Sequence, residues 1–159
     1  MNPKRTFLQK ALGRYNVVKP ETNLTAEQLK DNRYDRIKEG IAHNETRGVK
    51  TDPYLFSQHS GDDNQGDAIG RYQVTEGELK TYGKKYLGRD VDIANFRKNP
   101  VAQDEYIKAK IKTLALRGNT PEQIADIHRR GVANSSPAGS RVYQDPKYVK
   151  DFQTAYNRQ

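Results

Sequence analysis

Apolar and polar residues alternate along most of the chain with the spacing of amphipathic helices, and the ends of these segments carry clear signals. Each segment begins at a residue that can cap a helix, and three of these residues are followed directly by proline, which suits the first helical position. Four segments end at glycine, a common residue just beyond a helix. The pattern predicts five helices, over residues 25–48, 75–88, 99–118, 120–131 and 145–156.

Between the first two helices, two short runs rich in aromatic and β-branched residues, 54–58 and 70–74, flank a polar loop. This arrangement is typical of an antiparallel β-hairpin. The predicted fold class is therefore α+β and predominantly helical, with a small β-hairpin after the first long helix. Residues 1–24 are interpreted as a basic N-terminal arm with a short helix around Thr6–Leu12, and residues 25–159 as one domain.

Composition narrows the classes of partner. The chain has 159 residues, and its 28 Lys and Arg against 20 Asp and Glu give a formal charge of +8. That charge favours anionic partners such as nucleic acid, acidic lipid or a cell-wall polymer. The chain has no cysteine and its three histidines are isolated, so we expect neither a metal site nor a cofactor. No apolar run approaches the roughly 20 residues of a transmembrane helix, so we expect none.

One carboxylate lies on the apolar face of the first predicted helix. Glu45 continues, at spacings of three, four and four, an apolar stripe formed by Tyr34, Ile37 and Ile41. It should therefore face the core, where loss of solvation would raise its pKa, as a general acid needs near neutral pH. The alternative is that Glu45, in the last turn, reaches solvent or pairs with Arg47.

Three segments and a late tyrosine carry a further signal. Residues 41–48 read Ile-Ala-His-Asn-Glu-Thr-Arg-Gly, residues 68–74 read Ala-Ile-Gly-Arg-Tyr-Gln-Val, and residues 124–131 read Ile-Ala-Asp-Ile-His-Arg-Arg-Gly. In this order they resemble the Glu-Ser, Gly-x-x-Gln-[Ile/Val] and Ala-x-Tyr-Asn-x-Gly motifs of lytic transglycosylases and goose-type lysozymes, in the lysozyme superfamily. His128 and Arg129 replace the Tyr-Asn pair, and Tyr148 lies where the family has Tyr-Val. The resemblance spans about residues 26–157.

The resemblance implies that the protein is a muramidase, a glycosidase that degrades the cell wall. Glu45 would protonate the β-1,4 glycosidic oxygen between N-acetylmuramic acid and N-acetylglucosamine, and would then act as base. Tyr143 or Tyr148 would lean over Glu45, although core packing is the favoured interpretation for Tyr148. The substrate-binding candidates are Gln73, Tyr72, Ser57, Ser60, His128 and Tyr143. Among these, His128 should face inward because it follows Ile124 by four residues.

The number of carboxylates separates two versions of this activity. A hydrolytic glycosidase generally uses a second carboxylate as nucleophile or base. Lytic transglycosylases as a family instead let the N-acetyl and 6-hydroxyl groups of muramic acid complete the reaction, which gives a 1,6-anhydro product. Each candidate for a second acid has another explanation. Three lie in the predicted loop, where acids commonly form turns, and they are Asp62, Asp63 and Asp67. The fourth, Glu76, lies in the first turn of a predicted helix, where its charge is favoured by the helix dipole. A single-glutamate lytic transglycosylase is therefore the leading hypothesis, and a hydrolytic lysozyme is the alternative.

Two further hypotheses are binding modules without catalysis. One is a nucleic-acid-binding domain, suggested by the charge and by the lysines at 108, 110 and 112, but bases are mixed with acids along the chain and no specific nucleic acid is expected. The other is a cell-wall-binding module, suggested by His128 and Arg129. We expect peptidoglycan as partner, with residues 1–24 docking on a virion or secretion-system component. Because the first residues lack the apolar stretch of a signal peptide, we expect export by a virion, a secretion apparatus or a membrane lesion.

Overall fold

The computed structural model of the protein describes residues 25–131, 143 and 145–159. The chain divides into two compact units, Met1–Asn32 and Arg33–Gln159, with the boundary inside the first long helix. Of the first unit, residues 25–32 are described, and they include the start of that helix. The predicted arm 1–24 and its short helix lie outside the described residues. The candidate site lies entirely within the second unit.

Six α-helices and one short 3-10 helix are present in the described part of the chain. They are α2 (Ala26–Thr46), η1 (Pro53–Leu55), α3 (Glu76–Leu87), α4 (Ile93–Phe96), α5 (Pro100–Leu116), α6 (Pro121–Arg130) and α7 (Pro146–Tyr156). The five predicted helices are confirmed as α2, α3, α5, α6 and α7. Helix α4 was not predicted, because four residues are too few to show a helical period, although Asp92 caps it through the backbone N–H groups of Ala94 and Asn95.

The capping residues of α3 and α6 accept hydrogen bonds from the first turn of their helices. The Thr75 hydroxyl accepts a hydrogen bond from the backbone N–H of Glu78 at 3.1 Å and so begins α3. At the start of α6, Thr120 and Gln123 form a reciprocal capping box. These bonds satisfy N–H groups that the first turn of a helix leaves without partners, which is why the starts of these helices could be located from sequence.

A three-stranded antiparallel sheet follows α2, in the order β1 (Ser57–His59), β2 (Asp67–Ile69) and β3 (Val74–Thr75). The predicted hairpin, which would pair 54–58 with 70–74, is wrong in its boundaries. Asp52 accepts from the backbone N–H of Tyr54 at 2.9 Å and draws residues 53–55 into η1. Gly70, at φ +69°, starts a turn that Gln73 closes by donating its N–H to the Gly70 carbonyl. That turn ends β2 and creates the third strand.

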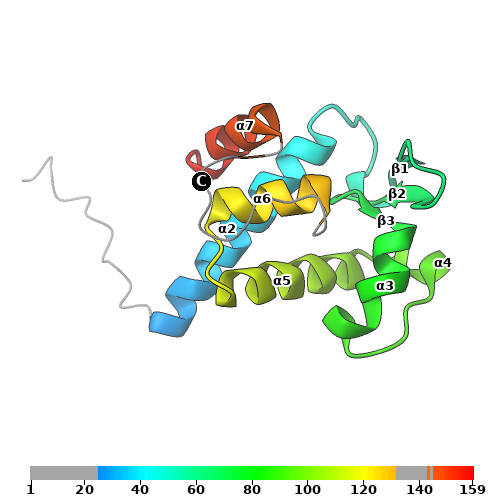
Figure 1. Cartoon of the computed structure of the whole chain (residues 1–159), viewed down its shortest axis with the longest axis horizontal. Coiled ribbons are helices and arrows are strands. Elements are labelled where there is room, and N and C mark those ends of the chain that lie inside the picture. Colours follow the sequence, from blue (N-terminus) through cyan, green and yellow to red (C-terminus); the bar gives the residue numbers. More distant parts are fainter. Residues whose placement is uncertain (1–24, 132–142, 144) are drawn as a thin grey trace, which may run out of the picture. The chain divides into compact units, whose positions relative to one another are not determined.

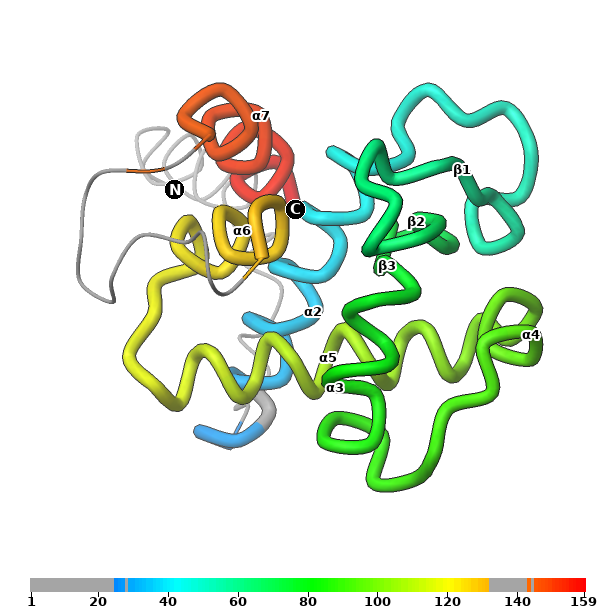
Figure 2. Tube along the Cα trace, turned by 45° about the vertical axis from the view of Figure 1, so that its right-hand side comes forward, coloured from blue at the N-terminus to red at the C-terminus, as the bar shows by residue number. Residues whose placement is uncertain are grey.

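Within Arg33–Gln159, α6 and α7 lie on one side, and the sheet and α3 lie on the other (Figures 1 and 2). Helix α5 runs beneath both sides, and residues 33–46 of α2 pass between them. The predicted apolar stripe of α2 faces the core, since Tyr34 is 8% exposed and Ile37 and Ile41 are fully buried. No helix in the described residues has the length and apolar composition needed to cross a membrane.

Candidate functional site

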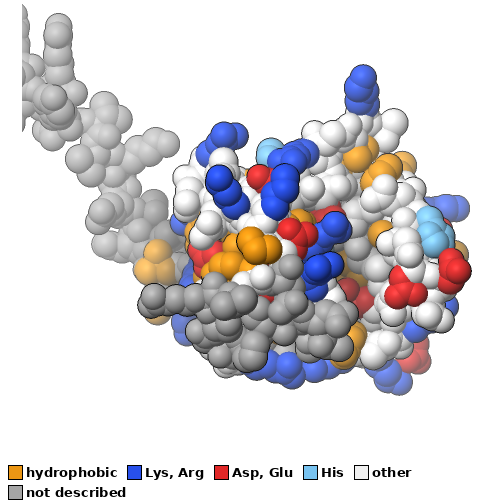
Figure 3. Space-filling model, turned by 45° about the horizontal axis from the view of Figure 1, so that its top comes forward, with side chains coloured by type: hydrophobic (Ala, Val, Ile, Leu, Met, Phe, Trp, Pro, Cys, Tyr) orange, Lys and Arg blue, Asp and Glu red, His pale blue; other side chains and the backbone are white. Residues whose placement is uncertain are grey.

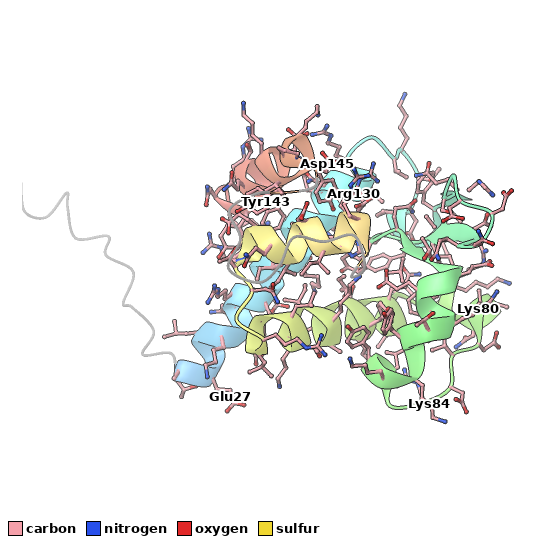
Figure 4. The ribbon with its side chains drawn as sticks, in the orientation of Figure 1. Glu27, Lys80, Lys84, Arg130, Tyr143 and Asp145 are labelled. Carbon is pink, nitrogen blue, oxygen red and sulfur yellow. The ribbon has the colours of Figure 1, made fainter. Side chains whose placement is uncertain are left out.

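An open cleft of about 460 Å³ separates the last turn of α6 from the sheet and α3. Its lining is mostly polar and includes the side chains of Glu45, Gln73, Glu78, Lys110, His128 and Arg129. Figure 4 shows Lys80 and Lys84 projecting from α3. Arg130 is the last residue of α6, and Asp145 directly precedes α7. Lysine and arginine side chains stand beside acidic ones on the face shown in Figure 3, so that face carries mixed charge.

Glu45 lines the cleft, and its side chain is 10% exposed. The Tyr148 hydroxyl donates a hydrogen bond to Glu45 Oε1 at 2.7 Å. The Nε2 atom of His128 lies 3.9 Å from the same oxygen. Arg47 pairs instead with Asp151, at 3.5 Å, so the alternative in which Arg47 holds Glu45 is wrong.

Burial raises the pKa of Glu45 above its ordinary value. The hydrogen bond from Tyr148 and the positive charges of Arg129 and Lys110 lower that pKa, but they offset only part of the effect of burial. Glu45 therefore keeps its proton to a higher pH than an exposed glutamate does. A carboxyl group of this kind can act as a general acid near neutral pH.

Tyr148 is placed by the start of α7. Asp145 caps that helix by accepting from the Tyr148 N–H at 3.0 Å, and the Asn44 amide donates to the Tyr148 carbonyl at 2.8 Å. The Arg129 guanidinium carbon lies 5.6 Å from the centroid of the Tyr148 ring. The sequence favoured core packing alone for Tyr148; its ring does pack against the core, and its hydroxyl also contacts Glu45.

A buried chain of polar contacts continues from His128 away from Glu45. His128 Nε2 lies 2.7 Å from the Tyr72 carbonyl oxygen, and His128 Nδ1 lies 3.3 Å from Lys110 Nζ. Lys110 Nζ in turn lies 2.6 Å from Glu78 Oε1, which also accepts from the Tyr106 hydroxyl. The inward orientation predicted for His128 is confirmed, with 8% of the residue exposed. Sequence reasoning did not single out Glu78 or Lys110 as site residues.

Gln73 lies at the turn between β2 and β3, in a backbone conformation that is uncommon for residues other than glycine, with φ +50°. Its amide Nε2 donates to the Gly70 carbonyl at 2.8 Å, which fixes the side chain. Its Oε1 is buried and has no hydrogen-bond partner within the described residues. Buried acceptors without a partner are rare in proteins.

The structure brings some of the other candidates to the cleft. Ser60 lines it, whereas Ser57 and the half-buried Tyr143 are not part of its described lining. The Tyr72 side chain is fully buried in the core and its hydroxyl donates to Asp104 at 2.5 Å, so its ring does not face the cleft. Tyr72 contributes its backbone carbonyl, through the contact with His128.

The candidates for a second acid occupy different positions. Asp67 and Glu76 both bind the Arg97 guanidinium, and the Asp63 side chain is 99% exposed. Asp62 lines the cleft but is exposed, and its carboxylate accepts from the backbone N–H of Asn64 at 2.9 Å, as in a turn. Of the four, Asp62 alone belongs to the described cleft lining.

No group of three or more potential metal ligands occurs among the residues whose positions are described. Searches of protein-family models, of curated proteins and of solved structures found no match to this chain.

Proposed function

We propose that this protein is a peptidoglycan-cleaving muramidase, and specifically a lytic transglycosylase that cuts the β-1,4 bond between N-acetylmuramic acid and N-acetylglucosamine. The observation that carries the proposal is Glu45, a largely buried carboxyl group with a raised pKa that lines an open polar cleft. The order of the sequence motifs supports the same activity. The confirmed fold class, with a small sheet after the first long helix, is compatible with it.

In the proposed reaction, Glu45 gives its proton to the glycosidic oxygen as the bond from C1 of muramic acid breaks. Since Tyr148 donates to Oε1, Oε2 is the oxygen that carries the proton. The N-acetyl oxygen of muramic acid bonds to C1, and its 6-hydroxyl then displaces that oxygen and forms the 1,6-anhydro ring. The Glu45 carboxylate takes the hydroxyl proton, so the residue returns to its starting state without water.

The formal charge of +8 would concentrate the protein on the anionic wall, an attraction that salt weakens. We place its action at the bacterial cell wall, with peptidoglycan strands as its partner. The proposed docking of residues 1–24 on a virion or secretion-system component concerns a segment outside the described residues.

Product masses test the reaction class. Purified peptidoglycan digested by the protein should yield muropeptides one water lighter than hydrolysis products, because the 6-hydroxyl replaces water. Products of full hydrolytic mass would contradict the transglycosylase proposal and favour a lysozyme. In that case Asp62→Asn should also abolish activity, because Asp62 is the candidate second acid that lines the cleft.

Tyr148→Phe should shift the pH dependence of cleavage. Removing the hydroxyl removes a bond that stabilises the Glu45 carboxylate, so the pKa of Glu45 rises further and its acid form persists to higher pH. The alkaline limb of the rate profile should therefore move to higher pH, while the maximal rate falls about tenfold because the carboxyl group is less firmly held. Rates of muropeptide release between pH 4 and 9 measure both effects.

Tyr82→Phe is the matched control, because Tyr82 also lines the cleft but is on α3 and contacts Tyr86. Its profile should follow that of the wild type. A Tyr148→Phe profile with an unmoved or acid-shifted alkaline limb would contradict the role given to the hydroxyl.

A further inference from the structure

Two largely buried opposite charges, one on α3 and one on α5, line the cleft. The Lys110 side chain is 3% exposed and that of Glu78 is 16% exposed, and their charged atoms lie 2.6 Å apart. Burial opposes ionisation of Glu78, but the charge of Lys110 and the hydrogen bonds from Lys110 and Tyr106 outweigh it and lower its pKa. A buried ion pair is often no more stabilising than apolar residues of similar size, so stability alone is a weak explanation for this pair.

Two contacts, one with Lys110 and one with the Tyr72 carbonyl, determine which nitrogen of His128 carries the proton. An ammonium group only donates hydrogen bonds, so His128 Nδ1, 3.3 Å from Lys110 Nζ, must act as the acceptor. A neutral imidazole that accepts at Nδ1 carries its proton on Nε2. That proton is donated to the Tyr72 carbonyl, 2.7 Å away, and is therefore directed to the backbone.

Charged groups face His128 from four helices. Glu45 approaches from α2, Glu78 from α3, Lys110 from α5, and Arg129 is its neighbour on α6. Burial, followed by the charge of Lys110, lowers the pKa of His128 to about 4, although the charge of Glu78 and the bond to the Tyr72 carbonyl favour the protonated form. Tyr148 of α7 donates a hydrogen bond to the same Glu45 oxygen that His128 approaches.

We propose that Lys110, held by Glu78, is a positioning residue that fixes His128 as the neutral imidazole with its proton on Nε2, and so prevents an ion pair between His128 and Glu45. The inference rests on the proposed role of Glu45 as general acid. An imidazolium 3.9 Å from Glu45 would stabilise the carboxylate and remove the proton that the first step needs. Lys110 thus protects the acid form of Glu45 although it does not touch the reacting atoms.

The test combines Lys110→Met with the double variant Lys110→Met/Glu78→Gln. In the single variant, the Glu78 carboxylate stays buried without its lysine and favours the imidazolium form of His128, whereas the double variant removes both charges. Two-dimensional NMR of the imidazole nitrogens reports the protonation state and tautomer of each histidine. The exposed His43 and His59 serve as internal references.

In the wild type, His128 should stay neutral from pH 5 to 8, with its proton on Nε2. In Lys110→Met it should titrate within this range, and in the double variant it should again be neutral. The alkaline limb of cleavage should move to lower pH in Lys110→Met, with a rate about tenfold below wild type at pH 7, and should recover in the double variant. Simple loss of the Lys110 charge would move that limb to higher pH instead, because this charge by itself lowers the pKa of Glu45.

A wild-type His128 that carries its proton on Nδ1, or that becomes protonated between pH 5 and 8, would overturn the inference, and so would a neutral His128 in folded Lys110→Met. The wild-type measurement needs no variant and can overturn the inference even if Lys110→Met does not fold. If Glu45 proves not to be the acid, cleavage will survive Glu45→Gln while the state of His128 is still measured by NMR. Failure of the proposed function is therefore distinguishable from failure of this inference.

Discussion

Replacing Glu45 with glutamine is expected to lower the rate of peptidoglycan cleavage by at least about 10²-fold, the lower end of what general acid catalysis contributes. Glutamine has nearly the same shape, and its carbonyl oxygen can accept the Tyr148 hydrogen bond, but it has no proton to deliver. Folding and binding to the wall should be retained. Release of soluble muropeptides and sedimentation with purified walls measure the two properties separately.

Asp62→Asn is the matched control for Glu45→Gln, since it also converts a cleft-lining acid into its amide. It should retain cleavage if Glu45 works alone.

The two variants should also differ in stability, because burial raises the pKa of Glu45 in the folded protein. The folded state is then disfavoured as pH rises through that pKa, so Glu45→Gln should melt at a higher temperature than wild type at pH 8, with the gap closing near pH 4. An equal gap at both pH values would contradict a desolvated Glu45.

Gly70→Ala is expected to lower the free energy of unfolding by roughly 2–4 kcal/mol. Cleavage should be lost at temperatures at which this variant is unfolded. Gly70 has φ +69°, and a Cβ atom there would lie 2.0 Å from Gln103 Oε1. Gln103 has little freedom to move, since it is 1% exposed and its amide donates to the carbonyls of Tyr54 and Phe96. Urea denaturation followed by circular dichroism measures the loss.

Gly61→Ala separates the two causes of that loss. Gly61 also has a positive φ, +84°, but a Cβ atom there would meet nothing within 4 Å. This variant should therefore show the backbone cost alone, about 1 kcal/mol. Equal losses in Gly61→Ala and Gly70→Ala would mean that the contact with Gln103 contributes nothing.

The helices could be predicted from sequence because their starts are encoded by single residues. Thr75 and Thr120 each place a hydroxyl where an unpaired N–H of the first turn needs an acceptor. The strands could not be located as well, because two local turns override the runs of β-forming residues. Asp52 accepts a hydrogen bond from the Tyr54 N–H and so places Tyr54 in η1, outside the strand that residues 54–58 were expected to form. Gly70, with its positive φ, starts a turn within the second expected strand, residues 70–74. The second turn also depends on a contact across the chain, since the Arg71 N–H donates to Gln103 Oε1 at 3.2 Å.

The candidate site was predictable in part for similar reasons. The helical period placed Glu45 and His128 inward, and both line the cleft. Glu78 was not recognised as a site residue, because it lies in the first turn of α3, where an acid is already explained by helix capping. Lys110 follows Ile107 by three residues and therefore lies on the buried face of α5, a signal that could have identified it. Its pairing with Glu78 depends on how α3 packs against α5, which the sequence pattern does not specify.

The most direct measurement is mass spectrometry of the soluble products that wild type and Glu45→Gln release from purified bacterial peptidoglycan. We expect 1,6-anhydro muropeptides from the wild type and none above background from folded, wall-binding Glu45→Gln. Equal product release by the two proteins, or no release by the wild type, would contradict the proposal that Glu45 is the acid of a peptidoglycan-cleaving site.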